Sequence, residues 1–193
     1  MKLLYLHGFR SSPNSMKAQK CLAHVEKLRK MGDRIDWYCP QLPPSPQQAI
    51  EMVMQHIESW QGHQMAVIGS SMGGFYATYI AEYKRCGAVL LNPCVAPAIK
   101  MQQYIEDHPV LDESDKKYVQ PSFVEEFAAL DVPVTMPERY FLILSKDDEE
   151  LDYREAVKHY AKSEKKLLEK SGHRIDDFDD HIEDIFDFIG LGV

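Results

Sequence analysis

The sequence predicts a doubly wound α/β fold, with a mostly parallel six-stranded sheet and helices on both of its faces. Short apolar runs alternate with segments of helical periodicity along most of the 193 residues. A parallel step between strands needs a crossover of about a dozen residues or more, which the helical segments supply. Right-handed crossovers place helices on both faces of a sheet. We expect residues 1–193 to form a single domain.

The strands are expected where β-rich apolar runs end at a turn residue. Lys2–Leu6 ends before His7-Gly8, and Met65–Gly69 has the continuous apolar core typical of a buried strand. Ala88–Leu91 is another buried run, and it ends at Asn92-Pro93. The other expected strands are Arg34–Cys39, Arg139–Leu144 and Lys165–Glu169.

The helices are expected where apolar residues recur three or four positions apart. The first such face ends before Gly32 and comprises Ala18, Cys21, Leu22, Val25 and Leu28. Ser45 is placed to cap a second helix with Pro46 at its first position. The buried side of that helix would hold Ile50, Val53, Met54, Ile57 and Trp60. Further helices are expected at Met72–Tyr83, Tyr153–Ser163 and Asp177–Ile189.

The stretch from about residue 93 to 138 lacks this alternation. Among its short amphipathic pieces are Pro97, Pro109, Pro121, Pro133 and Pro137. It falls between two strands of the expected sheet, so we expect a helical cap insertion. Active sites of such sheets lie at the carboxyl ends of the strands, and the cap would cover that edge. Its large side chains either line an acyl pocket or pack onto the body: Met101, Tyr104, Tyr118, Phe123 and Phe127.

Composition excludes several classes of function. The 22 Lys and Arg against 30 Asp and Glu give a net charge of −8, which disfavours nucleic acid as a partner. No apolar stretch is long enough to span a membrane, and the apolar start is too short for a signal peptide. The four cysteines form no C-x-x-C pair, which favours buried thiols in a reducing, cytoplasmic compartment over a disulfide or zinc framework.

The strongest motif is Gly69-Ser70-Ser71-Met72-Gly73, a G-x-S-x-G pattern between an expected strand and an expected helix. A sharp turn there forces the central residue into a strained backbone conformation, and the two glycines avoid clashes. Ser71 would therefore expose its hydroxyl at the edge of the sheet. Ser70 lacks the two-residue spacing to glycine on both sides, so Ser71 is the candidate nucleophile.

A serine hydroxyl needs a general base, and the base needs an acid that orients it. His173 is the candidate base because it comes directly after a late strand, whereas His181 falls within the last expected helix and is interpreted as solvent-exposed. Several carboxylates follow the strand Arg139–Leu144. Asp148 is our first choice for the acid and Asp147 our second, while helix-dipole stabilisation would explain most of the remaining acidic residues.

The oxyanion of an acyl-transfer intermediate requires backbone N–H donors. Met72 supplies one because it follows the nucleophile, and Phe9 supplies the other from the loop after the first strand. His7, in the same loop, is interpreted as a hydrogen-bonded structural residue.

These features resemble the α/β-hydrolases, and within them the small bacterial YqiA-like esterases. The narrower resemblance is carried by Leu3-Leu4-Tyr5-Leu6-His7-Gly8-Phe9, Gln41-Leu42-Pro43-Pro44, Ile68-Gly69-Ser70-Ser71-Met72-Gly73-Gly74, Leu91-Asn92-Pro93 and Leu151-Asp152-Tyr153-Arg154-Glu155-Ala156-Val157. The resemblance implies hydrolysis of small-molecule carboxylic esters, thioesters included, with Ser71 as nucleophile, and it supports Asp148 as the acid.

The family's pattern differs from this chain in three places. Asp147 stands where the family has glycine, Arg174-Ile175 stand where Ala-Phe often follows the histidine, and Ala96 stands where arginine often precedes proline. Acyl transfer by these residues requires no metal and no cofactor. An acyltransferase or peptidase using the same triad, or a non-catalytic binding protein on the same fold, is the alternative. The residues leave the acyl-chain length, other substrate-binding residues and oligomeric state open.

Overall fold

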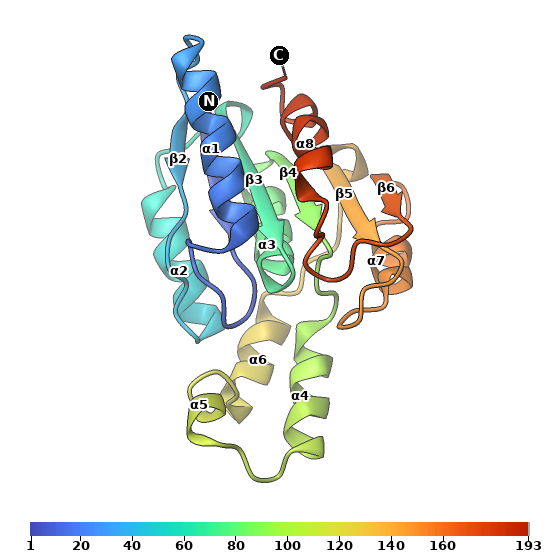
Figure 1. Ribbon diagram of the computed structural model, residues 1–193. Helices are drawn as coiled ribbons and strands as arrows, with labels where there is room; N and C mark the ends of the chain where they lie inside the picture. The colour runs from blue at the N-terminus through green and yellow to red at the C-terminus, as the bar shows by residue number, and fades with distance from the viewer. Residues whose placement is uncertain (193) are drawn as a thin grey trace.

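The computed structural model describes residues 1–192 and contains one six-stranded sheet in which all strands are parallel. The strand order is β2-β1-β3-β4-β5-β6, so the chain starts inside the sheet and winds outward in both directions. The strands are β1 (Lys2–Leu6), β2 (Asp36–Tyr38), β3 (Met65–Ser70), β4 (Gly87–Leu91), β5 (Tyr140–Ser145) and β6 (Glu164–Leu168). The predicted doubly wound α/β fold is confirmed (Figure 1).

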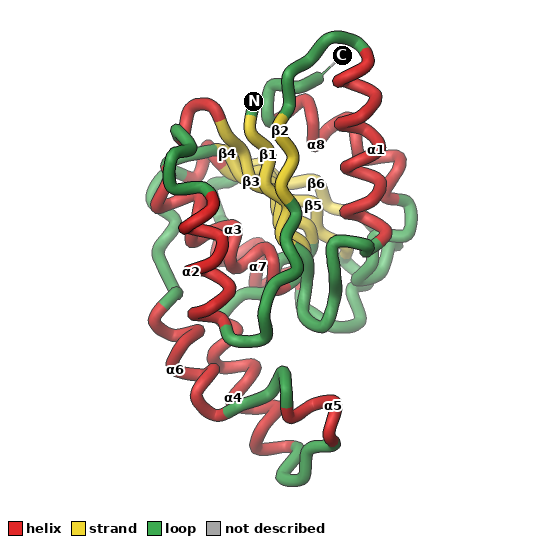
Figure 2. The backbone as a smooth tube through the Cα atoms, turned by 90° about the vertical axis from the view of Figure 1, so that its left-hand side faces the viewer, coloured by secondary structure: helices red, strands yellow, loops and turns green. Residues whose placement is uncertain are grey.

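Helices cover both faces of the sheet, as Figure 2 shows. Helices α1 (Met16–Lys30) and α8 (Ile182–Phe188) lie on one face. Helices α2 (Pro46–His56), α3 (Met72–Lys84) and α7 (Tyr153–His159) lie on the other. Three short 3₁₀ helices span Gly62–Gln64, Pro137–Arg139 and Phe178–His181. In the part of the chain covered by the structure, no helix has the length and apolar character needed to cross a bilayer.

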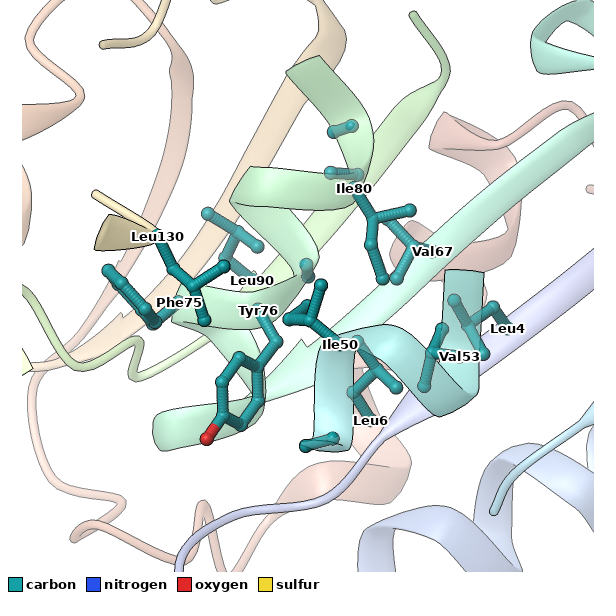
Figure 3. Close-up of a cluster of buried hydrophobic side chains, with 14 of the residues drawn as sticks. Leu4, Leu6, Ile50, Val53, Val67, Phe75, Tyr76, Ile80, Leu90 and Leu130 are labelled. Carbon is teal, nitrogen blue, oxygen red and sulfur yellow. The ribbon is translucent and has the colours of Figure 1, made fainter. Parts of the chain in front are cut away.

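Each face of the sheet has its own hydrophobic core, because successive side chains of a strand point to opposite faces. Leu4 and Leu6 of β1 contribute to the core under α2 and α3, whereas Leu3 and Tyr5 contribute to the core under α1 and α8. Figure 3 shows the first core, in which Ile50, Val53, Phe75, Tyr76 and Ile80 pack against Leu4, Leu6, Val67 and Leu90. Strands buried on both faces explain the continuous apolar runs.

The element boundaries differ from the sequence predictions by more than one residue at four places. Strand β2 is shorter than Arg34–Cys39, and α2 ends at His56, so that Trp60 packs from the following turn. Helix α7 ends at His159 rather than Ser163, where the buried Tyr160 hydroxyl hydrogen-bonds Thr78 Oγ1 at 2.7 Å. The predicted helix Asp177–Ile189 divides into a 3₁₀ turn and α8. The contacts of Trp60 and Tyr160 are tertiary, and local periodicity does not record them.

The chain between β4 and β5 forms three helices: α4 (Pro97–Asp107), α5 (Glu113–Lys116) and α6 (Pro121–Ala129). They extend from the edge of the sheet where the strands have their carboxyl ends (Figure 1). Each of α4 and α6 begins with proline at its first position, where the missing N–H costs nothing. Met101, Phe123 and Phe127 are buried in the core that α2 and α3 share, so this helical insertion is packed onto the body.

The turn between β3 and α3 lies against the end of β1 at backbone contact distance. A Cβ atom added to Gly73 would overlap the backbone carbonyl of Leu6, and one added to Gly69 would overlap the carbonyl of Gly73. Because β1 is hydrogen-bonded between two other strands, it has no freedom to move away. The two glycines of the G-x-S-x-G motif are therefore required by close backbone packing.

We expect Gly73→Ala to lower the free energy of unfolding by about 2 kcal/mol or more, because the added methyl group overpacks a rigid backbone contact. Urea denaturation followed by circular dichroism measures the change. Gly87→Ala in β4 is the matched control, since its Cβ would meet nothing nearer than the Arg139 carbonyl at 4.0 Å. An equal loss of stability in both variants would contradict the close-packing explanation.

Candidate active site

Ser71 occupies the sharp turn between β3 and α3 in a strained conformation, with φ 55° and ψ −120°. Such a conformation costs a non-glycine residue about 1–3 kcal/mol. Backbone hydrogen bonds hold it in place: the Ser71 amide donates to the Leu91 carbonyl at 2.9 Å, and the Cys94 amide donates to the Ser71 carbonyl at 3.0 Å. These bonds fix the turn to the end of β4, and Ser71 lines a cavity.

Two backbone amides adjoin Ser71 without a protein partner. A Cβ atom on Gly8 would lie only 3.1 Å from the Ser71 Cβ, so the loop after β1 runs directly beside the serine. Phe9 follows Gly8 in this loop, and Met72 begins α3. Among residues 1–192, neither the Phe9 nor the Met72 amide donates a hydrogen bond. Both remain available as donors to a bound group near Ser71.

The imidazole of His173 is paired with the carboxylate of Asp148. The His173 Nδ1 atom lies 2.8 Å from Asp148 Oδ2 and 3.0 Å from Oδ1. An ionised carboxylate only accepts hydrogen bonds, so in the neutral ring Nδ1 carries the proton and Nε2 is the accepting nitrogen. The pair is well shielded, with side-chain exposures of 10% for His173 and 2% for Asp148. His173 and Asp148 are therefore placed as a general base and its orienting acid would be.

The loop that carries His173 is held by neighbouring carboxylates. Asp147 Oδ1 accepts hydrogen bonds from the Ser145 hydroxyl at 2.6 Å and from the amides of Ser171 and Gly172 at 2.9 and 3.0 Å. Glu149 accepts from the His173 amide at 2.9 Å. Asp147, our second choice for the acid, therefore contacts the loop backbone and not the imidazole, and helix-dipole stabilisation does not account for Glu149. They bind backbone N–H groups of a distant loop, a contact that local sequence does not reveal.

Asn92 joins the ends of three segments and was missed as a site residue in the sequence. Its buried side chain donates from Nδ2 to the carbonyls of Gly172 and His173, both at 3.1 Å, and accepts from the Ser145 amide at 2.8 Å. An asparagine directly after a buried strand and before proline was the available signal. It ties the turn after β4 to the histidine loop and the end of β5.

Ser71 and His173 line the same cavity, which has a volume of about 340 Å³. Within residues 1–192 the Ser71 hydroxyl makes no hydrogen bond. The His173 Nε2 atom lies 3.4 Å from Glu150 Oε2, and that glutamate side chain is 63% exposed. In proteins of this kind without a ligand, a nucleophile–base contact is often longer than in the substrate complex. The predicted nucleophile and base are thus brought to one cavity, with Glu150 beside the free nitrogen of the base.

A second, narrower cavity of about 30 Å³ adjoins the first and shares Gly8, Phe9 and Ser11 with it. Tyr118 and Phe127 of the helical insertion and its flanks line this narrower cavity. Met101 and Phe123 are instead buried in the core, and the Tyr104 hydroxyl donates to Asp115 at 3.2 Å. Two of the five expected pocket residues therefore reach a cavity next to Ser71.

The other histidines take different places. His7 is buried, with Nδ1 2.9 Å from the Gly8 carbonyl and Nε2 accepting from the Leu42 amide at 3.0 Å, which confirms its structural interpretation. His181 is only 6% exposed, so its interpretation as a solvent-exposed residue was wrong. The 3₁₀ turn places it inward, beside Asp177 and away from the cavity of Ser71.

The part of the chain that the structure describes has a further hollow away from Ser71 and no cluster of metal ligands. No group of three or more His, Cys, Asp or Glu side chains in residues 1–192 is arranged to hold a metal ion. A larger hollow of about 560 Å³ lies beside α3 and is lined by Tyr79, Glu82, Arg85 and neighbours. None of the predicted catalytic residues borders it, so its chemistry is separate from that of Ser71.

Comparison with known proteins places the chain in a family. The Uncharacterised protein family (UPF0227) matches residues 2–190. The chain belongs to this family. Solved structures show the same α/β-hydrolase fold. A putative hydrolase from Agrobacterium vitis S4 has a TM-score of 0.70 at 16% identity, covering 97% of this chain and 87% of that protein.

Two further solved structures share the fold of this UPF0227 member. The mouse alpha/beta hydrolase domain-containing protein 10 has a TM-score of 0.69 at 16% identity, covering 96% of this chain and 89% of its own. An esterase from Exiguobacterium antarcticum has a TM-score of 0.64 at 14% identity, covering 98% of this chain and 92% of its own. At these identities the similarity establishes the fold.

The hydrogen bonds of Asp147 to the loop that carries His173 should depend on pH. The Ser145 hydroxyl, and then the amides of Gly172 and Ser171, lower the pKa of the Asp147 carboxyl from its ordinary 3.8 to about 2. A lowered pKa means that the loop contacts are fully present above pH 3.8 and are lost as the pH falls through about 2.

We expect Ser145→Ala to raise the pKa of Asp147, measured by carbon-detected NMR titration. The pKa of Asp152, which the Arg154 amide lowers, is the internal control, and an ordinary pKa for Asp147 in the unaltered protein would contradict the assignment.

Proposed function

We propose that this chain is a serine hydrolase that cleaves small-molecule carboxylic esters, thioesters included, with Ser71 as nucleophile, His173 as base and Asp148 as orienting acid. The observation that carries the proposal is the His173–Asp148 pair, which leaves Nε2 as the accepting nitrogen in the cavity that Ser71 lines. The strained turn at Ser71 and the two unpaired amides beside it support the same assignment. Esterases and hydrolases among proteins of the same fold add to this support.

In the first half-reaction, the Ser71 Oγ attacks the carbonyl carbon of the ester, and its proton passes to Nε2 of His173. Asp148 holds the imidazole through Nδ1 and stabilises the resulting imidazolium. The Phe9 and Met72 amides donate to the oxyanion of the tetrahedral intermediate. The intermediate then breaks the bond to the leaving alcohol or thiol, which takes the proton from Nε2, and an acyl-enzyme remains.

In the second half-reaction, water attacks the acyl-enzyme while Nε2 takes one of its protons. Collapse of the second tetrahedral intermediate returns that proton to the Ser71 Oγ and releases the carboxylic acid. Each cycle consumes one ester and one water, and releases one alcohol or thiol and one carboxylic acid. Glu150 must turn away from Nε2 for this cycle, which its exposed position allows.

The helical insertion serves as a cap in this proposal. The ring of Phe9 packs edge-on against Tyr118 at 5.7 Å, and Arg10 forms an ion pair with Asp115. Both contacts join the insertion to the loop that carries the Phe9 amide. The cap therefore positions one of the two proposed oxyanion donors and narrows the cavity beside it.

A fluorophosphonate probe tests the nucleophile. It phosphonylates an activated serine, so we expect the unaltered protein to be labelled and Ser71→Ala to lose all labelling, as read by mass spectrometry. Ser70→Ala is the matched control, because Ser70 is the adjacent residue at the end of β3 and should leave labelling in place. Labelling at a residue other than Ser71 would overturn the assignment.

Substitutions of Asp148 and Asp147 distinguish orientation of the imidazole from support of the loop that carries it. We expect Asp148→Asn to lower kcat by about a thousandfold or more, because the amide no longer holds the correct imidazole tautomer. Asp147→Asn weakens only the loop contacts, and we expect a loss of about tenfold or less. Hydrolysis of 4-nitrophenyl butyrate measures both. A larger loss for Asp147→Asn would move the acid role to that residue.

Product analysis distinguishes the related activities. An acyltransferase would give a new ester when an alcohol is added in competition with water, and a peptidase would cleave amides at rates comparable to esters. A non-catalytic binding protein would show neither phosphonylation nor turnover.

A further inference from the structure

The cavity at Ser71 has an uneven distribution of charge. Lys17, in the first turn of α1, and Arg174, which follows His173, both line it. Neither cation forms an ion pair with another of residues 1–192. The Lys17 ammonium group has three protons to donate, and its contact is with the His173 carbonyl at 3.4 Å. Two neighbouring cations beside the proposed nucleophile therefore have unused donor capacity.

The half-buried position of Lys17 is unfavourable without an anion. Burial, opposed by Asp148 and Glu150 and assisted by Arg174, lowers the pKa of Lys17 from its ordinary 10.5 to about 8. Lys17 still carries its charge at neutral pH, and a buried charge is costly unless it is paired. Asp148 is already paired with His173, and Glu150 faces Nε2 of the same ring. A negatively charged group in the cavity would supply the missing partner.

We propose that Lys17 and Arg174 form a carboxylate-binding subsite, so that the preferred substrates are esters carrying one negative charge. This inference rests on the proposed function, because the subsite opens into the cavity of Ser71 and His173. Ser11 and Ser15 line the same cavity. Glu150 opposes the subsite with its own negative charge, so two cations and one anion favour a monoanionic ligand.

Matched pairs of esters test the subsite and locate the charge on the substrate. The 4-nitrophenyl monoester of glutaric acid against 4-nitrophenyl pentanoate places the carboxylate on the acyl side. 4-Acetoxybenzoate against its methyl ester places it on the leaving group. For each pair, the quantity measured is the ratio of kcat/KM for the anionic ester to that for the neutral ester.

We expect the unaltered protein to favour the anionic ester in one of the two pairs. Lys17→Gln and Arg174→Gln should each lower that ratio by about tenfold, mainly through KM, the effect of losing one charge-assisted hydrogen bond. Glu150→Gln should raise the ratio, because it removes the opposing charge. Lys20→Gln is the matched control: this lysine lies on the same helix, pairs with Asp179 and does not line the cavity, so the ratio should stay unchanged.

A binding measurement separates this inference from the proposed function. Ser71→Ala should bind monomethyl glutarate more tightly than dimethyl glutarate in calorimetric titration, and Lys17→Gln in that background should remove the difference. Ester turnover with equal ratios in all variants would overturn the subsite and leave the proposed function standing. Absent turnover with preferential binding of the anion would overturn the proposed function alone. Equal binding of the two glutarates would overturn the subsite whether or not esters are cleaved.

Discussion

The close approach of the β3–α3 turn to the end of β1 is the constraint on which the site depends. Gly73 lies against the Leu6 carbonyl and Gly69 against the Gly73 carbonyl, with no space for a side chain at either position. This packing fixes the turn in which Ser71 adopts its strained conformation with positive φ. It also brings Gly8, the residue after His7, against the serine side chain. The nucleophile and one proposed oxyanion donor are therefore positioned by the same backbone contact.

A second set of contacts joins loops that are far apart in the sequence. Residues 147–149 follow β5, and residues 171–173 follow β6, which is the neighbouring strand. In a parallel sheet the carboxyl ends of the strands meet at one edge, so carboxylates of one loop reach the amides of the next. Asp147 and Glu149 bind the backbone of the histidine loop, and Asp148 binds the imidazole. Each of three successive acidic side chains thus has its own partner, and Asn92 holds the same loop from β4.

The cavity also shows how the charges in the site oppose one another. Net charge over the chain is −8, yet the cavity of Ser71 is bordered by Lys17 and Arg174 as well as Glu150. Burial and the charges of neighbouring groups determine the state of Lys17, as its lowered pKa indicates. Overall composition therefore says little about the local charge that a ligand would meet. The relevant field comes from a few side chains that the fold places around one opening.

Periodicity and motif spacing were sufficient to predict the α/β fold, the six strands and the turn at Ser71. They sufficed because residues close together in the sequence determine which strand positions are apolar and where a strand turns into a helix. They left Asp148 and Asp147 as alternative partners of His173, and the tertiary structure places Asp148 against the ring. The partners of Asp147, Glu149 and Asn92, the buried position of His181 and the cations beside Ser71 depended on the tertiary structure. Contacts across 24 or more residues, such as His173 with Glu149, arise only when the strand ends converge, and no local pattern encodes that convergence.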